Sequence, residues 1–404
     1  MSSTLITNIG ELTTVTSETL RDAALVVDGG TIAWIGAASA APAADEMYDG
    51  DGLAVLPGWV DSHTHMVFDG DRAEEFVTRM AGGEYAAGGI NVTVAATRAA
   101  GAERLRKLVS SRVSAAAAQG TTFLETKTGY GLDVATELLS GEVASEYADT
   151  VTYLGAHVVP TGMDADEYVD LVIGPMLDAV RPYVQWIDVF CERGAFDEEQ
   201  SRSILQAGKD AGLGIRVHAN QLGEGAGVQL AVEMGAASAD HLNYLNDRDY
   251  ESLRSSWDGW STDGAAGVPG TVATVLPACD LSTRAPLAPA RQLLDAGIPV
   301  AIASNCNPGT SYTSSMPFNV ATAVLQYRLT IEEAVRAATY TPAVALGRHA
   351  PVSTAEGEVP AVGSIAVGHQ ADIQVLDAPS IAHLAYRPGM PLTKRVMKKG
   401  EWIL

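Results

Sequence analysis

Cysteine is scarce in this sequence, and the three cysteines it has, at positions 191, 279 and 306, form no CxxC pair. A disulfide framework needs an even set of cysteines, and a thiolate zinc site needs closely spaced pairs. The sequence therefore predicts neither a disulfide framework nor a thiolate zinc site.

Basic residues are also few. There are 26 lysines and arginines against 49 aspartates and glutamates, which gives a formal net charge of −23. Nucleic acids and anionic membranes are polyanions that bind basic surfaces. We therefore expect no nucleic-acid and no membrane partner, and a surface this acidic also favours solubility.

Long apolar runs are missing as well. No stretch approaches the roughly 18 apolar residues of a transmembrane helix. The segment 1–8 has neither a basic region nor a long apolar one, so it does not read as a secretory signal. We expect a cytoplasmic protein.

The two ends of the 404-residue chain are rich in β-type residues. A hairpin is expected where Asp28-Gly29-Gly30 separates two apolar runs, and short strands are expected at 5–8, 373–376 and 395–397. We predict a small β-sandwich domain built from both termini, residues 1–57 and 359–404.

Between the ends, residues 58–358 alternate apolar β-type runs with Ala/Leu/Glu-rich segments of helical length, such as 134–148, 197–211 and 224–234. Eight such runs occur, at 58–68, 121–126, 150–159, 184–190, 214–219, 236–242, 271–277 and 299–304. Eight β-then-α units predict an α/β fold, a closed (β/α)8 TIM-like barrel. An open doubly wound sheet is the alternative, although no Gly-x-Gly-x-x-Gly turn follows the first strand.

Five of the eight histidines fall at the ends of predicted strands. In a (β/α)8 barrel the active site lies at the carboxyl ends of the strands. His63 and His65 are two residues apart, so on a strand they point to the same face. With His218 they predict a site for one divalent ion, zinc or iron. His157 and His241 could lie behind the ligands or contact a substrate, and the alternative that none of the five binds metal stays open.

Three further side chains near strand ends have two interpretations each. Lys127 could be a carbamylated ligand in a binuclear site, or it could form a structural ion pair with Glu125. Tyr130, in a Gly-rich turn, could bind a substrate or cap the barrel. Arg72 could grip a carboxylate with its planar guanidinium or be a solvated surface arginine.

Several segments together resemble a known family. The run Leu56–His65, with the tail Gly368–Asp372, is similar to the amidohydrolase superfamily. The segments Lys127–Leu132, Gly155–Pro160, Ser238–His241 and Asn307–Ser311, with the spacing from Arg72 to Tyr85, resemble the imidazolonepropionase family within it. The similarity covers nearly the whole chain.

The resemblance implies a distorted barrel with a small β-sandwich, commonly in a homodimer. The implied activity is hydrolysis of 4-imidazolone-5-propanoate to N-formimidoyl-L-glutamate, a step of histidine breakdown. The implied metal ligands are His63, His65, His218 and the position of Asn305. The implied contacts with the small-molecule substrate or product are Arg72, Tyr130, His157, Gln221, Asn307, Gly309 and Thr310.

The sequence departs from the family pattern at two positions. Asn305 stands where the family normally has Asp, and Gln221 stands where it often has Glu. An asparagine binds a metal only through its carbonyl oxygen and cannot act as a base. Both changes remove negative charge beside the ion, so we expect weaker metal binding.

We therefore predict a mononuclear hydrolase in which Asn305 is a weak or outer ligand. Gln221 orients the ring and does not titrate, so we predict His241 as the residue that accepts the proton of the attacking water. The alternative is that the hydroxide forms unaided. Two other functions stay open: a superfamily hydrolase or deaminase acting on another cyclic amide, and a catalytically silent binding protein.

Overall fold

The computed structural model describes residues 2–82, 89–261, 267–355 and 357–404, so Tyr85 lies outside the described residues. By compactness the chain divides into two units. One comprises Met1–Asp61, Ala115–Phe123 and Ser315–Leu404, and the other Ser62–Ser114 and Leu124–Ser314. The boundaries at 57 and 358 stay a prediction. Among the described residues, no helix has the length and apolar character needed to cross a bilayer.

The middle of the chain forms an eight-stranded sheet whose strands pair in chain order, β6 to β13. The pairs from β7 to β13 are parallel. The strands are β6 (Trp59–Asp61), β7 (Thr121–Lys127), β8 (Thr150–Ala156), β9 (Trp186–Cys191), β10 (Gly214–Ala219), β11 (Ser238–His241), β12 (Val272–Val275) and β13 (Val300–Ile302). Each strand lies within one of the eight predicted runs, except that β7 and β9 extend slightly past the ends of theirs.

The sheet closes on itself just beyond its first and last strands. The backbone N–H of Asn305 donates to the carbonyl of His63 at 2.9 Å, and that of His65 donates to the carbonyl of Cys306 at 3.0 Å. These bonds join the segment after β13 to the segment after β6. The predicted (β/α)8 barrel is confirmed, and the open sheet is excluded.

Several helices begin where the sequence offers a capping side chain. Asp133 caps α3, Asp197 caps α6 and Asn246 caps α8, each accepting hydrogen bonds from the first turn. The helices are α1 (Ala73–Met80), α2 (Ile90–Ala117), α3 (Val134–Tyr147), α4 (Ala165–Leu171), α5 (Leu177–Val180), α6 (Glu198–Asp210), α7 (Gly227–Met234), α8 (Asp247–Ser255), α9 (Pro277–Thr283), α10 (Ala290–Asp295), α11 (Met316–Leu325), α12 (Ile331–Ala337), α13 (Tyr340–Ala345) and α14 (His383–Tyr386). The three helices expected at 134–148, 197–211 and 224–234 are confirmed as α3, α6 and α7.

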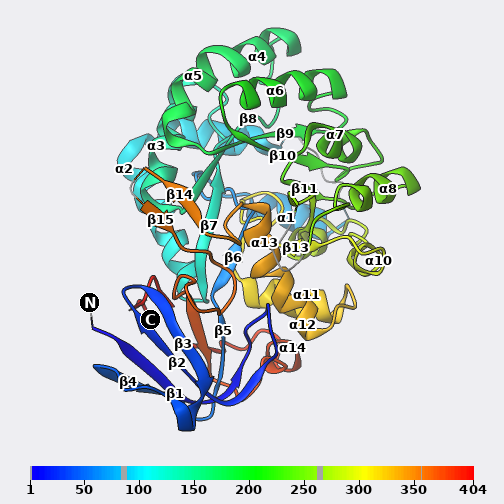
Figure 1. Cartoon of the computed structure of the whole chain (residues 1–404). Helices are drawn as coiled ribbons and strands as arrows, with labels where there is room; N and C mark the ends of the chain where they lie inside the picture. The colour runs from blue at the N-terminus through cyan, green and yellow to red at the C-terminus, as the bar shows by residue number, and fades with distance from the viewer. Residues whose placement is uncertain (1, 83–88, 262–266, 356) are drawn as a thin grey trace. The chain divides into compact units, whose positions relative to one another are not determined.

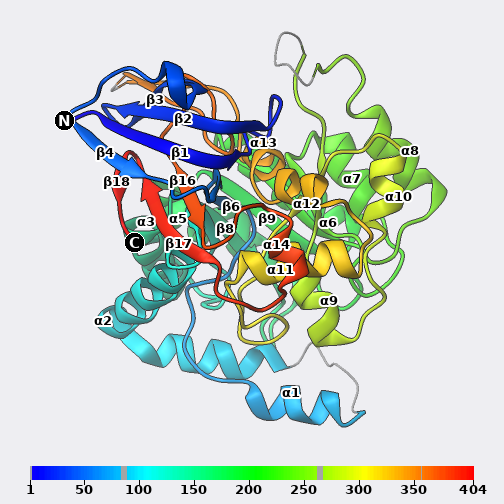
Figure 2. The same cartoon turned by 90° about the horizontal axis from the view of Figure 1, so that it is seen from below.

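The first and last strands of the chain share a second sheet, in the order β18-β17-β16-β5-β1-β2-β3, with β4 beside β1. Figures 1 and 2 show its blue N-terminal and red C-terminal strands side by side. The strands are β1 (Thr4–Leu12), β2 (Leu20–Asp28), β3 (Thr31–Ala37), β4 (Glu46–Asp49), β5 (Ala54–Pro57), β16 (Ile373–Leu376), β17 (Thr393–Lys398) and β18 (Glu401–Trp402), while β14 (Val352–Thr354) pairs with β15 (Gly357–Val359).

This terminal sheet branches at β1, whose first half pairs with β4 and whose last two residues pair with β5. An irregularity between Ile6 and Ile9 separates the halves, and bulges of this kind bend a sheet. Apolar side chains from β1, β2, β5, β16 and β17 pack in one buried core. The predicted β domain built from both termini is confirmed.

Candidate active site

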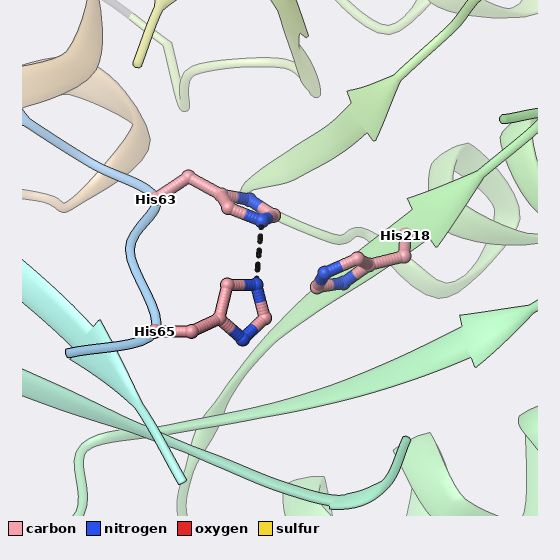
Figure 3. A group of neighbouring side chains, drawn as sticks. All are labelled: His63, His65 and His218. Atoms are coloured by element: carbon pink, nitrogen blue, oxygen red, sulfur yellow. Dashed lines mark hydrogen bonds between the residues drawn. The ribbon is translucent and has the colours of Figure 1, made fainter. Parts of the chain in front are cut away.

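Three histidines meet at the carboxyl ends of two barrel strands. His63 and His65 follow β6 directly, and His218 lies in β10 (Figure 3). One ring nitrogen of each lies within 4.8 Å of the others, and all three side chains are buried. The Nε2 atoms of His63 and His65 are 3.3 Å apart, as are two nitrogens on one tetrahedral zinc with Zn–N bonds of about 2.05 Å.

Buried carboxylates hold two of these rings from behind. His63 Nδ1 lies 2.6 Å from Asp240 Oδ2, and His218 Nδ1 lies 3.0 Å from Asp188 Oδ2. A carboxylate on Nδ1 fixes the tautomer and leaves Nε2 as the ligand atom. Burial opposes the ionisation of Asp188, but His218 and Lys127 outweigh it and hold its pKa below the usual range.

Lys127 belongs to the same buried network. Its ammonium donates to Glu125 at 2.9 Å and lies 3.1 Å from Asp188. Arg216 lies 3.4 Å from Asp240 in the same way. The expected pair with Glu125 is present, although it is fully buried and has a second carboxylate that we did not predict. An ammonium between two carboxylates supports the structural interpretation of Lys127.

Asn305 points a polar atom into the site. Its side chain is buried, its backbone is left-handed at φ 52°, and its Oδ1 has no hydrogen-bond partner among the described residues. Its amide also hydrogen-bonds the thiol of Cys279, whose pKa burial raises to about 12. The unpartnered Oδ1 is an acceptor and could bind a cation.

The polar atoms without partners test whether a metal fits. Within the described residues, His218 Nε2 and Asn305 Oδ1 are buried beside the His63–His65–His218 cluster and make no hydrogen bond. Such an atom costs about 1–3 kcal/mol if nothing satisfies it. Three neutral imidazoles and a carbonyl oxygen form a donor set that suits zinc or iron(II). The residues present therefore fit one divalent ion.

The cluster lines a pocket of about 690 Å³, which includes solvent space at its mouth. Ten of the twelve predicted site residues line it: His65, Arg72, Tyr130, His157, His218, Gln221, His241, Asn305, Asn307 and Thr310. The two exceptions are His63, which is fully buried, and Gly309, which lies against Arg72. The structure thus brings these residues together from the ends of different strands.

His241, the last residue of β11, lies with its ring centroid 5.3 Å from that of His218. Burial, with His218 next in importance, lowers its pKa well below 6.5. The shift follows from the complete enclosure of the ring, which disfavours its charged form. The ring is neutral at neutral pH and can accept a proton.

Tyr130 and His157 form the wall beside His65. The His157 and His65 rings stack with centroids 5.4 Å apart, and Tyr130 lies 5.3 Å from His157. His157 Nδ1 lies 3.0 Å from the carbonyl of Gly129, so Nδ1 carries the proton and Nε2 is an acceptor. Burial, then the charge of His218, lowers the pKa of His157 to about 4.

A buried carboxylate that we did not predict shapes the turn carrying Tyr130. Glu137, in the first turn of α3, accepts hydrogen bonds from the backbone N–H groups of Gly129, Gly131 and Leu132 at 2.7–3.0 Å. Burial raises its pKa, against the effect of these bonds. The sequence offered a signal, since a glutamate at the start of a helix can bind the loop before it.

Arg72 is buried, so the solvated-arginine interpretation is wrong. Its Nε and Nη2 donate to the two carboxylate oxygens of Glu75 at 2.7 and 2.8 Å. In the turn that adjoins Arg72, Asn307 Oδ1 accepts from the backbone N–H groups of Gly309 and Thr310, both at 2.8 Å. The Asn307 amide is therefore engaged in holding its own turn.

Arg193 also lines the pocket, and sequence reasoning missed it. It follows the end of β9 by two residues and is exposed. The strand-end rule that identified the histidines could have found it. Asp188 and Asp240 lie inside strands, and only the folded barrel shows which histidine each contacts.

Comparisons with known proteins identify the family of the chain and support its fold. The amidohydrolase family model matches residues 191–403. An imidazolonepropionase of Arthrobacter sp. (strain FB24) is 64% identical over 400 residues, 98% of this chain and 99% of that protein. One of Paenarthrobacter aurescens is 62% identical over 401 residues, 99% of this chain and 98% of that protein. A zinc-bound adenosine deaminase from Xanthomonas campestris shares the fold, with a TM-score of 0.71 at 18% identity, over 99% of this chain and 92% of that one.

Proposed function

This chain belongs to the imidazolonepropionase family of the amidohydrolases, and we propose that it hydrolyses 4-imidazolone-5-propanoate to N-formimidoyl-L-glutamate in histidine breakdown. The bond that breaks is a cyclic amide C–N bond, and water supplies the new oxygen. The observation that carries the proposal is the three-histidine cluster in a pocket that Arg72 also lines.

His63, His65 and His218 would hold one zinc or iron ion per chain, with Asn305 Oδ1 as a weak or outer ligand. Such an ion, when bound, lowers the pKa of a coordinated water and polarises the carbonyl that is attacked. Asp240 lies against Nδ1 of His63 and Asp188 lies against Nδ1 of His218, which would leave each Nε2 for the ion.

Arg72 would bind the propionate carboxylate, because a guanidinium offers two parallel donors to a carboxylate. Thr310 and the backbone of Gly309 lie beside it in the turn that Asn307 holds. Tyr130, His157 and Gln221 would orient the ring, with His157 Nε2 as an acceptor for a ring N–H.

His241 would take the proton of the attacking water. It is neutral and buried among the ligands, and its Nδ1 has no hydrogen-bond partner in the described part of the chain. Gln221 lines the same pocket but does not titrate, so it can only hydrogen-bond the water or the ring.

Turnover of imidazolone propionate by protein of measured metal content tests the proposal. We expect activity that rises with metal content up to one ion per chain. A protein that binds the ion but hydrolyses only another ring amide would be a different hydrolase or deaminase. A protein that neither retains metal nor turns over any ring amide would be a silent binding protein. We expect the enzyme to act in the cytoplasm as a homodimer.

A further inference from the structure

Three charged residues lie along one face of α1, and the middle one, Glu75, contacts the other two. Arg72 precedes the helix, and Glu75 and Arg79 follow at spacings of three and four, which places their side chains on one face. Arg72 makes two hydrogen bonds to the Glu75 carboxylate, at 2.7 and 2.8 Å. Arg79 Nη1 lies 3.7 Å from the same carboxylate. One carboxylate therefore lies between two guanidinium groups.

Both guanidinium groups are enclosed, since the Arg72 and Arg79 side chains are only 5% and 3% exposed. Arg79 Nη2 donates to the carbonyl oxygen of Gly309 at 3.0 Å. The Arg79 side chain therefore ties α1 to the turn that forms the pocket wall. A bidentate pair between an enclosed guanidinium and a partly buried carboxylate fixes the plane of the guanidinium as well as its position.

The backbone at two glycines lies very close to the Arg72–Glu75 pair. A Cβ atom on Gly89 would lie 2.2 Å from Glu75 Oε2 and 2.4 Å from Arg72 Nη2, and one on Gly309 would lie 2.3 Å from Arg72 Nη1. Such distances are impossible without movement of the pair. The lack of a Cβ at Gly89 and Gly309 thus lets the backbone lie directly against the Arg72–Glu75 pair.

We propose that Glu75 is a positioning residue, which holds the Arg72 guanidinium in the plane that receives the substrate carboxylate. The proposal rests on the proposed function, in which Arg72 binds the propionate.

The alternative is that Glu75 only competes with the substrate carboxylate for the N–H groups of Arg72. Glu75→Gln would then strengthen substrate binding. In the positioning case, the new amide nitrogen faces one of the two Arg72 N–H groups that Glu75 now accepts. Two donors cannot face each other, so the guanidinium must turn away from its present plane.

The experiment compares Glu75→Gln with the wild type on two substrates, imidazolone propionate and the corresponding propionamide, which has a neutral amide in place of the carboxylate. We expect KM for the propionate to rise about tenfold, with kcat within twofold. The kcat/KM for the propionamide should be unchanged. Glu74→Gln makes the same charge change at an exposed position of the same helix and should leave both substrates within twofold of the wild type.

A second variant perturbs the pair without changing any charge. Gly89→Ala should also raise KM for the propionate and spare the propionamide, because its methyl group displaces Glu75 and Arg72 together. An unchanged or lower KM in Glu75→Gln overturns the proposal, as does an equal loss on both substrates in the two variants. Failure of the proposed function would appear separately, as a wild-type protein of known metal content that does not hydrolyse the propionate.

Discussion

Replacing Asn305 by aspartate should tighten metal binding, and the contacts of this residue set the size of the effect. Its Oδ1 is buried with no hydrogen-bond partner among the described residues, beside three histidines. The charged groups behind them are three carboxylates, Glu125, Asp188 and Asp240, and two cations, Lys127 and Arg216. That set carries a net charge of −1, so a divalent ion is not fully neutralised.

A carboxylate at position 305 adds one negative charge next to the ion. A pair of unit charges 4 Å apart interacts by about 4 kcal/mol at an effective dielectric constant of about 20. Burying the carboxylate costs several kcal/mol, and losing the hydrogen bond to Cys279 costs about 1 kcal/mol more. Because the ion carries two charges, we expect a net gain of about 1.4–2.8 kcal/mol, or 10–100-fold in metal affinity.

The assay is zinc competition against a chelator of known affinity, combined with the melting temperature of the metal-free and zinc-loaded protein. Without the ion, the added carboxylate is buried and unpaired, so metal-free Asn305→Asp should melt below the metal-free wild type. With zinc the order should reverse. Asn246→Asp is the matched control, because aspartate caps a helix as well as asparagine does, and its zinc affinity should stay within twofold. If Asn305→Asp binds zinc no more tightly than the wild type, Asn305 does not lie against the ion.

Three further predictions address the rest of the site. Purified protein should hold one divalent ion per chain and lose activity with a chelator; two ions per chain, with a modified Lys127, would overturn the mononuclear interpretation. Arg72→Lys should raise KM about tenfold, because a point charge replaces a bidentate donor, and unchanged steady-state kinetics would remove Arg72 from substrate binding. His241→Gln should lower kcat about 100-fold at unchanged metal content. Since His241 must be neutral to act, and burial lowers its pKa, the wild-type rate should fall with decreasing pH only below pH 6.5, and the variant should lack that acidic limb. A near-normal kcat in His241→Gln would show that the hydroxide forms unaided.

The strand ends could be predicted from the sequence because the barrel imposes the same sequence pattern eight times. Each strand is a short buried run followed by polar residues, so the position of His218 or His241 in the chain also gives its position on the rim. His63 and His65 differ from His218 and His241, because they do not lie on a strand. They lie just beyond β6, yet their ring nitrogens still approach each other as alternate strand residues would.

The partners of these residues could not be predicted, because they come from other strands. Asp240 is 177 residues from His63 in the chain, and nothing in the local sequence of either residue indicates the contact. Arg72 was ambiguous for a related reason. Its burial depends on Gly89 and Gly309, whose close approach exists only in the folded chain.

The bonds that close the barrel have a consequence for how the protein folds. They run through the backbone of His63, His65, Asn305 and Cys306, so the first and last strand segments meet at the ligand residues themselves. Contacts between residues so distant in sequence form slowly, since a long loop must close before they are made. The proposed ligand set of His63, His65, His218 and Asn305 is therefore complete only after the segment beyond β13 has paired with the segment beyond β6. A bound ion would link the first and last strand segments and slow their separation. The rate of metal loss would then measure how often these two segments separate.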